Sequence, residues 1–335
     1  MSNHLVTLVI RHHLLKGQAL IRCAHKMREG GGIKFLFSSI SDNSLLACSI
    51  PSMNQEVKRD ERPMRNPKRV KPSYIGVVHL PALPGDPRSN DRSYSPAYEH
   101  ALNDARALIE GGVEGIMIEN FGSAPFQKGT RQDPAPPHQV AALAVVAHEI
   151  KALAPEMKLG INCLRNDAIA ALGVAAAVGA DMIRVNVLSG AYVTDQGLIE
   201  GEAAATLRYR RQLNADHIKI FADVLVKHAS PLAPLEIEQA ALDTWRRGGA
   251  DALIVSGTGT GAAVSAELLK RAQEAVDYRC PVYIGSGLSL SNVSTLAPLA
   301  SGAIVGTALK HEGQLDAPVC ASRTRALGEV LASHW

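Results

Sequence analysis

From Tyr74 onward, the sequence repeats one unit, in which a short β-branched run is followed by a loop and a helical segment. Eight such runs can form buried strands: Ile75–Leu80, Gly115–Glu119, Lys158–Cys163, Met182–Val187, Ile218–Val224, Ala252–Ser256, and the runs that begin at Val282 and Gly302. Eight β/α units in unbroken alternation predict a closed (β/α)8 TIM barrel. A doubly wound open sheet is the alternative, which we favour less because so regular a series closes more naturally.

Helical patterns separate the runs and carry recognisable ends. Gly111 and Gly112 suit a C-terminal cap, Asn166 or Asp167 suits an N-cap, and Gly179 ends the third helix. The expected helices are Ala97–Glu110, one ending at Ala154, Asp167–Val178, one ending near Asn214, Leu235–Arg247, Ser265–Val276 and Pro318–Ala332.

The composition agrees with a sheet sheathed by helices. Hydrophobic residues make up 46% of the chain but aromatic residues only 4%, so Ala, Val, Ile and Leu must fill the core. The five cysteines are scattered without a CxxC pair, which argues against a zinc site or a disulfide framework and favours a reducing compartment. No apolar run reaches the length of a membrane span. We therefore expect a cytoplasmic protein.

Residues 1–73 differ from the remainder of the chain. They carry 13 Lys and Arg against 5 Asp and Glu, whereas residues 74–335 carry 22 against 27. Without sustained periodicity, they predict a basic, mostly disordered extension ahead of a barrel domain at 74–335. Three explanations stay open: a targeting segment, a basic tether, or translation from an early start, since Met53 and Met64 offer later ones. The barrel's basic residues form no stripe, so we expect no nucleic-acid partner.

Polar residues stand where the predicted strands end. A barrel brings these ends together at one mouth, where its chemistry takes place. Buried polar groups cost free energy unless they are paired, so these residues predict a ligand site. They are His79, Glu119 with Asn120, Asn162, Arg184 with Asn186, Asp223, and Ser256.

Glu119 and Asp223 are the best candidates for general acid and base catalysis, with an ion pair to Arg184 as the structural alternative. His79, Lys227 and His228 are further catalytic candidates, although a loop cap or a solvated pair would also explain them. The amides, Arg184 and the residues after the sixth strand are expected to bind substrate: Asn120, Asn162, Arg184, Asn186, Ser256, Gly257 and Thr258. Together with Asn162 and Asn186, the two carboxylates could also hold Mg²⁺.

The last two strands both end in glycine. Gly285-Ser286-Gly287 follows one of them and Gly306-Thr307 follows the other, which matches the phosphate site that barrels build after strands seven and eight. The run Gly257–Gly261 lacks the lysine of a P-loop and is expected to form a further backbone nest. No lysine ends the sixth strand, which disfavours class I aldolase chemistry, and there is no GxSxG or HExxH motif.

Eight ordered blocks resemble the BtpA/SgcQ family: Val78-His79-Leu80-Pro81-Ala82-Leu83-Pro84-Gly85, Ile118-Glu119-Asn120-Phe121-Gly122, Gly160-Ile161-Asn162, Arg184-Val185-Asn186-Val187, Thr194-Asp195-Gln196-Gly197, Asp223-Val224-Leu225-Val226-Lys227-His228-Ala229, Ser256-Gly257-Thr258 and Ile304-Val305-Gly306-Thr307. The resemblance covers residues 74–313. It implies a barrel of the ribulose-phosphate-binding type. It also implies either a peripheral thylakoid role in photosystem I biogenesis, as in the family's cyanobacterial branch, or a link to sugar metabolism, as in the SgcQ branch.

Two functions of different class follow. The first is an enzyme that acts on a phosphorylated sugar or nucleoside-like metabolite by isomerase-like or lyase-like acid and base chemistry. The second is a photosystem I assembly or stability factor, a protein-binding platform attached peripherally to the thylakoid membrane if the source is photosynthetic. Such a platform should show an exposed apolar patch or a basic face. In either case we expect a homo-oligomer.

Overall fold

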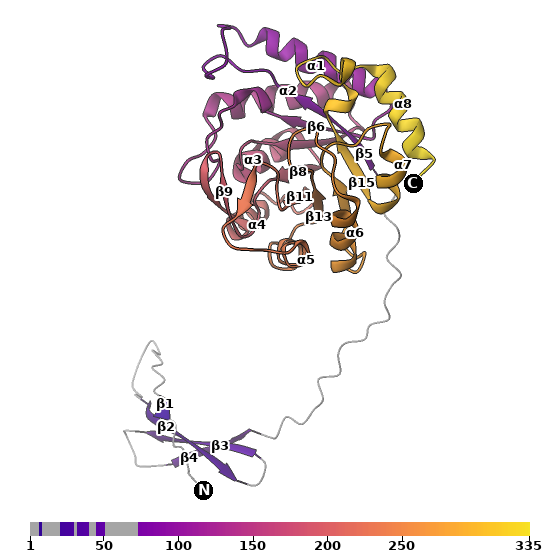
Figure 1. The fold of residues 1–335 in the computed structure, drawn as a ribbon. Helices are drawn as coiled ribbons and strands as arrows, with labels where there is room; N and C mark the ends of the chain where they lie inside the picture. Colours follow the sequence, from indigo (N-terminus) through magenta and orange to yellow (C-terminus); the bar gives the residue numbers. More distant parts are fainter. Residues whose placement is uncertain (1–6, 9–20, 30–31, 40–44, 51–72) are drawn as a thin grey trace. The chain divides into compact units, whose positions relative to one another are not determined.

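The computed structural model describes Thr7–Leu8, Ile21–Glu29, Gly32–Ser39, Leu45–Ile50 and residues 73–335 (Figure 1). The chain divides into two compact units, Met1–Asn66 and Pro67–Trp335. In the first unit, the four described segments are the strands β1 to β4 of an antiparallel sheet, in the order β1-β2-β3-β4. These strands depart from our expectation of an extension without regular structure. The rest of that expectation lies outside the described residues.

The second unit contains a closed barrel of eight parallel strands, as predicted. Around the barrel the order is β11-β13-β14-β15-β5-β6-β7-β8, and it closes where β15 pairs with β5, with Ile304 opposite Ile75. The strands are β5 (Ser73–His79), β6 (Gly115–Glu119), β7 (Lys158–Asn162), β8 (Met182–Val185), β11 (Lys219–Val224), β13 (Ala252–Val255), β14 (Val282–Ile284) and β15 (Gly302–Val305).

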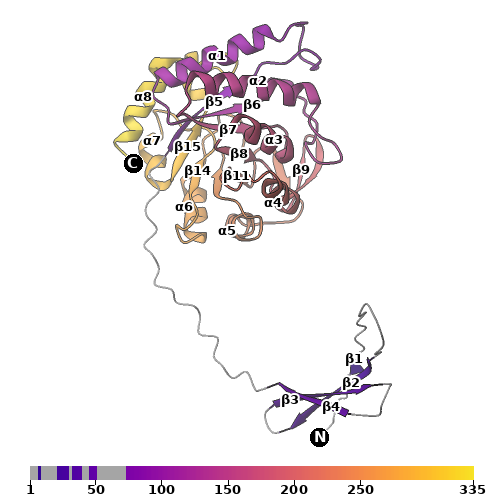
Figure 2. The same ribbon diagram turned by 180° about the vertical axis from the view of Figure 1, so that it is seen from behind.

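Helices surround the barrel on the outside, which both views show (Figures 1 and 2). Asp167 caps the third helix by accepting a hydrogen bond from the amide of Ala170 at 2.8 Å, and Gly179 ends that helix at φ +70°, as expected. The helices are α1 (Ser95–Glu110), α2 (Pro137–Leu153), α3 (Ala168–Val178), α4 (Ala203–Gln212), α5 (Ile237–Leu242) with its π-helical continuation η2 (Asp243–Arg247), α6 (Ala266–Ala275), the short α7 (Val293–Leu296) and α8 (Ala321–Ala332).

One element was not predicted from the sequence. A small antiparallel sheet with the order β10-β9-β12 forms from β9 (Ala191–Thr194), β10 (Gly197–Glu200) and β12 (Ala229–Pro231). We had expected loops after the fourth and fifth barrel strands. β9 and β10 form a local hairpin, whereas the pairing of β9 with β12 joins residues more than thirty positions apart, for which local periodicity carries no signal.

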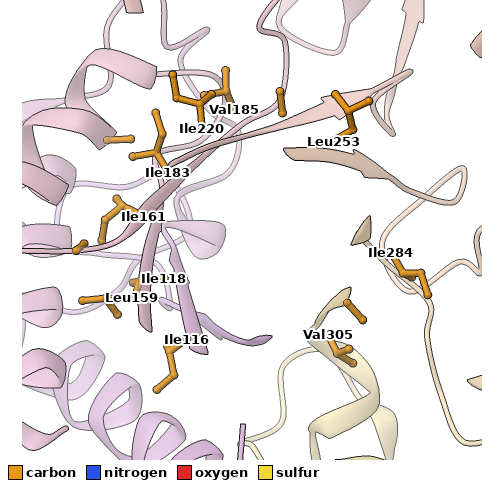
Figure 3. Packing of buried hydrophobic residues seen from close by; sticks show 14 of the residues in the cluster. Ile116, Ile118, Leu159, Ile161, Ile183, Val185, Ile220, Leu253, Ile284 and Val305 are labelled. Atoms are coloured by element: carbon orange, nitrogen blue, oxygen red, sulfur yellow. The ribbon is translucent and has the colours of Figure 1, made fainter. Parts of the chain in front are cut away.

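The strand residues alternate between two cores. Outward-facing residues such as Ile118, Ile161 and Leu253 pack beneath the helices (Figure 3). Inward-facing residues form a second apolar cluster inside the barrel: Ile75, Val77, Met117, Met182, Phe221, Ala252, Ile254, Tyr283 and Ile304. Two residues further along the same strands, the inward positions become polar or glycine. This change of polarity within one strand creates the site.

No helix among the described residues is both long and apolar enough to cross a membrane.

Candidate active site

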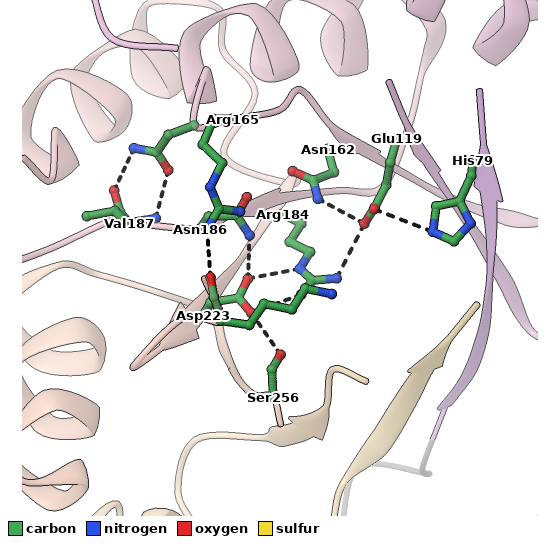
Figure 4. A network of polar contacts seen from close by, with 11 residues as sticks. His79, Glu119, Asn162, Arg165, Arg184, Asn186, Val187, Asp223 and Ser256 are labelled. Atoms are coloured by element: carbon green, nitrogen blue, oxygen red, sulfur yellow. Dashed lines mark hydrogen bonds and ion pairs between the residues drawn. The ribbon is translucent and has the colours of Figure 1, made fainter. Parts of the chain in front are cut away.

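At the mouth of the barrel, polar side chains form a layer above the apolar cluster. Arg184 is the centre of this polar layer, which also contains Glu119, Asn162, Asn186, Asp223 and Ser256 (Figure 4). Its Nε and Nη2 donate to the two carboxylate oxygens of Asp223, both at 2.9 Å, and its Nη1 donates to Oε1 of Glu119 at 3.3 Å. Burial alone would lower the pKa of Arg184, but the two carboxylates raise it above its ordinary value. The ion pair that we weighed as the structural alternative is therefore present, and it includes both candidate catalytic carboxylates.

Asp223 is bonded entirely within the protein. Besides Arg184, it accepts hydrogen bonds from Asn186 Nδ2 at 2.9 Å and Ser256 Oγ at 3.2 Å. Its side chain is completely buried and lines neither of the cavities described below. This geometry suits a group that fixes the positions of Arg184 and Asn186 more than one that meets a substrate.

Glu119 has a different environment, although it shares Arg184. Its Oε1 accepts from Asn162 Nδ2 at 2.9 Å, and its Oε2 lies 3.8 Å from Nε2 of His79. Burial would raise the pKa of Glu119, but Arg184, His79 and Lys227 together with the Asn162 hydrogen bond lower it below its ordinary value. Glu119 is therefore ionised at neutral pH, and it faces open space.

His79 is kept neutral. Burial lowers its pKa to about 4, despite the opposing effect of Glu119. The imidazole packs against Phe121 with ring centroids 4.8 Å apart, and its Nδ1 makes no hydrogen bond with a described residue. A neutral imidazole offers a hydrogen-bond donor at one ring nitrogen and an acceptor at the other.

Lys227 lies in a strained turn between β11 and β12. Leu225 and His228 have left-handed backbone conformations, with φ of 50° and 57°, and Arg165 Nη2 holds the Lys227 carbonyl oxygen at 2.7 Å. Burial and the charge of Arg184 lower the pKa of Lys227, and the two carboxylates offset only part of this effect. A desolvated lysine near an ionised carboxylate is a common proton-transfer group.

Two cavities at the mouth are lined by Arg184. The first, of about 260 Å³, is lined by the glycine-containing loops that follow β14 and β15. The second, of about 200 Å³, lies beside the loops after β5 to β8 and β11. Four residues line both cavities: Glu119, Arg184, Lys227 and Thr260. The cavities therefore adjoin at three charged side chains, those of Glu119, Arg184 and Lys227.

The loop after β14 has the properties of an anion nest. The amides of Ser286, Gly287 and Leu288 donate no hydrogen bond to a described residue, and these three residues line the first cavity. Gly287 has φ +69°, and a Cβ there would lie 2.2 Å from the carbonyl oxygen of Ala262. Only glycine fits this position, so the loop can present its bare backbone to a ligand.

The structure places most predicted site residues around these cavities. His79, Glu119, Arg184, Lys227, Gly285, Ser286, Gly287, Gly306 and Thr307 line the first, and Asn162, Asn186 and His228 line the second with Glu119, Arg184 and Lys227. Other predicted residues line neither. Asn120 is bonded to the backbone of Leu164 on both sides of its amide, the Gly257 amide donates to Ser286 Oγ, and Thr258 is exposed.

Several lining residues were missed. Arg323, near the start of α8, lines the first cavity together with Ser289 and Gly261. Arg88, Phe121, Phe126, Arg165 and Asp195 line the second cavity. Phe121 lies two residues past the end of β6, and the others apart from Gly261 lie in more distant loop positions or in the last helix, where strand periodicity cannot locate them. For Gly261, the predicted nest after the sixth strand was the available signal.

The residues do not fit a magnesium ion between the two carboxylates. The guanidinium of Arg184 already occupies the space between Glu119 and Asp223, and it would repel a second cation. Within residues 73–335 and the four described strands, no group of three His, Cys, Asp or Glu side chains is placed to hold a metal ion. No step of the proposed chemistry therefore involves a metal ion.

The family model described as the BtpA family matches residues 70–333. The chain belongs to the BtpA family. The resemblance seen in the eight sequence blocks is thereby confirmed. Among BtpA-family relatives, the photosystem I biogenesis protein BtpA of Synechocystis is 45% identical over 260 residues, which cover 77% of this chain and 87% of that protein.

Other relatives of this BtpA-family chain come from distant organisms. An uncharacterized protein of Methanocaldococcus jannaschii is 44% identical, covering 77% of this chain and 94% of its own length. An uncharacterized mitochondrial protein of Caenorhabditis elegans is 34% identical, covering 73% and 87%. Among solved structures, a thiamine phosphate pyrophosphorylase from Pyrococcus furiosus aligns with a TM-score of 0.49 at 18% identity, over 79% of this chain and 98% of that one.

Proposed function

We propose that this protein is an enzyme that binds a phosphorylated sugar or nucleoside-like metabolite and moves protons on it. One observation carries the proposal: a single cavity is lined both by the unpaired amides of Ser286 to Leu288 and by Glu119, His79 and Lys227. A bound phosphate at the nest would place the neighbouring carbon atoms of the ligand toward the titratable groups.

The division of labour follows from the contacts. The nest, Thr307 and Arg323 would hold the phosphate, and Arg184 would steady Glu119 and stabilise negative charge on the reacting oxygen. Glu119 is ionised and can accept a proton, while Lys227 and neutral His79 can transfer one to a second atom. Asp223 would act through Arg184. This arrangement suits isomerisation or elimination next to a carbonyl group.

Binding of phosphate can be tested by thermal shift of the full chain with inorganic phosphate, ribose 5-phosphate and other sugar phosphates. A ligand that binds the native state raises the apparent stability, by about 2.7 kcal/mol at a hundredfold excess over Kd. Arg323→Ala should weaken every shift, whereas Arg325→Ala should leave it unchanged. Arg325 is the matched control because it lies on the same helix but contacts Glu110, away from the nest.

The chemistry can be tested separately from binding. Any ligand found in this way would be incubated with the protein in D₂O and followed by NMR. Carbon-bound hydrogen should exchange with the unmodified protein and stop exchanging with Glu119→Gln or Lys227→Met, while phosphate binding persists. Binding without exchange would leave a binding protein, and the absence of any phosphate ligand would remove the proposed site altogether.

A second candidate, a photosystem I assembly factor, is favoured by a different observation. Val193, Leu198 and Leu232 are exposed on the small sheet; Val193 pairs directly with Leu198, and the Leu232 amide bonds to Ala191 of the same strand. Such an apolar patch suits a partner protein. Changing all three residues to serine should abolish co-purification with photosystem I if this candidate is right, and should leave phosphate binding intact. The nematode relative weighs against it as a family-wide role, since nematodes have no photosystems.

A further inference from the structure

The second cavity differs in chemistry from the phosphate cavity beside it. Phe121 and Phe126 line it, together with Leu164 and Ala124. Outside the N-terminal extension the chain has only three phenylalanines, and the third, Phe221, belongs to the barrel core. A chain this poor in aromatic residues therefore places two partly exposed phenyl rings at the mouth, which favours a ligand with an apolar, planar face.

An unsatisfied acceptor marks the same cavity. Asn186 is buried and lines the second cavity, and its Oδ1 accepts no hydrogen bond from a described residue. The orientation of the amide is fixed, because Nδ2 donates to the Asp223 carboxylate at 2.9 Å and a flipped amide would set two oxygens against each other. A buried acceptor without a partner is unfavourable until a donor reaches it.

Two carboxylates add further acceptors to this cavity. Asp195 contributes a second carboxylate to this cavity, and Glu119 stands at its junction with the first. Basic residues line the same cavity: Arg88, Arg165, Arg184, Lys227 and His228. Arg165 Nη2 is already bonded to the Lys227 carbonyl oxygen. A donor on the ligand can thus meet Asn186 Oδ1, Asp195 or Glu119 in this cavity.

We propose that the second cavity binds a planar nitrogen heterocycle that carries an N–H donor directed at Asn186 Oδ1, so that the ligand is a nucleotide-like phosphate ester and not an open-chain sugar phosphate. The proposal rests on the proposed function, since it assumes that the phosphate occupies the adjoining nest. It assigns the specificity of the site to Asn186, Phe121 and Phe126.

The test measures binding to the full chain by titration calorimetry with matched probes. Ribose 5-phosphate supplies the sugar and phosphate without a ring. Cytidine 5′-monophosphate and adenosine 5′-monophosphate add a ring with an exocyclic amine, and their analogues in which hydrogen replaces that amine keep the ring without that donor. We expect each nucleotide with an amine to bind at least tenfold more tightly than ribose 5-phosphate, and its analogue without the amine to lose most of that gain.

Two variants locate the effect. Phe126→Ala should reduce the gain from the ring and leave affinity for ribose 5-phosphate unchanged. Asn186→Leu should abolish the preference for the amine while Asp223 keeps its bonds to Arg184 and Ser256. If Asn186→Leu fails to fold, the comparison of paired probes on the unmodified protein still decides the matter.

The outcomes separate the two proposals. If ribose 5-phosphate binds as tightly as the nucleotides, or if Phe126→Ala weakens all probes equally, the heterocycle is wrong and the phosphate site stands. If no phosphorylated probe binds at all, the proposed function fails and this inference fails with it.

Discussion

On β6, Met117 and Glu119 face the same barrel interior two residues apart, yet their surroundings have little in common. Met117 packs among apolar side chains at one depth, in a cluster that also contains Phe221 and Ile254. Glu119 lies at the next depth with Arg184, Asn162 and His79. The same alternation occurs on β5, β8, β11 and β13, so the interior consists of an apolar layer beneath a polar layer.

The difference shows which layer was shaped by folding and which by function. The apolar layer stabilises the barrel by removing side chains from water. A buried ion-pair network seldom does better than hydrophobic residues of the same volume, because desolvation offsets the attraction. The polar layer therefore has no folding reason to exist at this depth, and a ligand is the simplest explanation for it.

The largest effect should come from breaking the polar layer at its centre. Arg184→Ala removes the cation between two buried carboxylates and should lower the free energy of unfolding by about 3–5 kcal/mol. Urea denaturation at pH 7 measures this. If the loss is below about 1 kcal/mol, the network is not the coupled unit that the contacts indicate.

A combined variant sharpens the same point. Arg184→Met with Asp223→Leu and Glu119→Gln replaces the buried charges by groups of similar volume. We expect most of the lost stability to return. The triple variant should not convert a phosphorylated substrate, because it lacks the Glu119 carboxylate and the Arg184 guanidinium. Recovery of turnover would contradict the assignment of the polar layer to function.

A substitution in the apolar layer should reduce stability but leave ligand affinity nearly unchanged. Ile254→Ala leaves a cavity at a fully buried position and should cost about 2–5 kcal/mol in the free energy of unfolding. Below the melting temperature, the affinity for a phosphate ligand should change by less than about twofold. A large loss of affinity without a loss of stability would show that Ile254 contributes to the ligand site, and would contradict the division into two layers.

Acid should weaken the polar layer through His79. The folded protein keeps His79 neutral until its pKa of about 4, whereas an unfolded histidine binds a proton near 6.5, so the unfolded state takes up more protons between these values. This contribution to stability is complete above pH 6.5 and falls by about 3 kcal/mol as the pH drops toward 4. Urea denaturation across this range should show the slope.

A matched pair of variants tests the source of that slope. His79→Gln should flatten the pH dependence of stability between 6.5 and 4. His148→Gln, on the exposed side of α2, should leave it unchanged. A slope that survives in His79→Gln would assign the acid sensitivity to another group.

The smallest effects are expected from substituting one residue of each layer, Ala252 on β13 and Ser256 directly after it. Ser256→Ala removes a hydrogen bond to Asp223 and should cost about 1–2 kcal/mol. Ala252→Ser puts a hydroxyl among apolar neighbours and should cost a similar amount. If Ala252→Ser is neutral in urea denaturation, the lower layer is less apolar in effect than its composition implies.

The barrel and the polar layer were accessible from the sequence for a common reason. Strand alternation has a fixed period of two, so β-branched runs that end in His79, Glu119, Asn162 or Asp223 give both the strand and the side chain that it delivers. Which of these groups would contact a ligand was not accessible. Asp223 is fully buried in its ion pair with Arg184, whereas Glu119 lies at the cavity wall. This difference depends on three-dimensional packing.

Residues outside the strands escaped prediction for the converse reason. Phe126 lies in a long loop without periodicity, and Arg323 belongs to a helix that begins sixteen residues after β15 ends. The small sheet joins β9 to β12 across an intervening helix and a barrel strand. Each of these positions is set by tertiary contacts that no local pattern encodes.

The two cavities draw on different parts of the chain, and this has an evolutionary consequence. The first cavity is supplied largely by the segments after β14 and β15 and by α8, whereas the second cavity is supplied by the loops after β5 to β8 and β11. New loops in the first two thirds of the chain could thus alter which molecule binds while the proposed phosphate site stays unchanged. The four residues common to both cavities, Glu119, Arg184, Lys227 and Thr260, are where such diversification would meet a shared reaction.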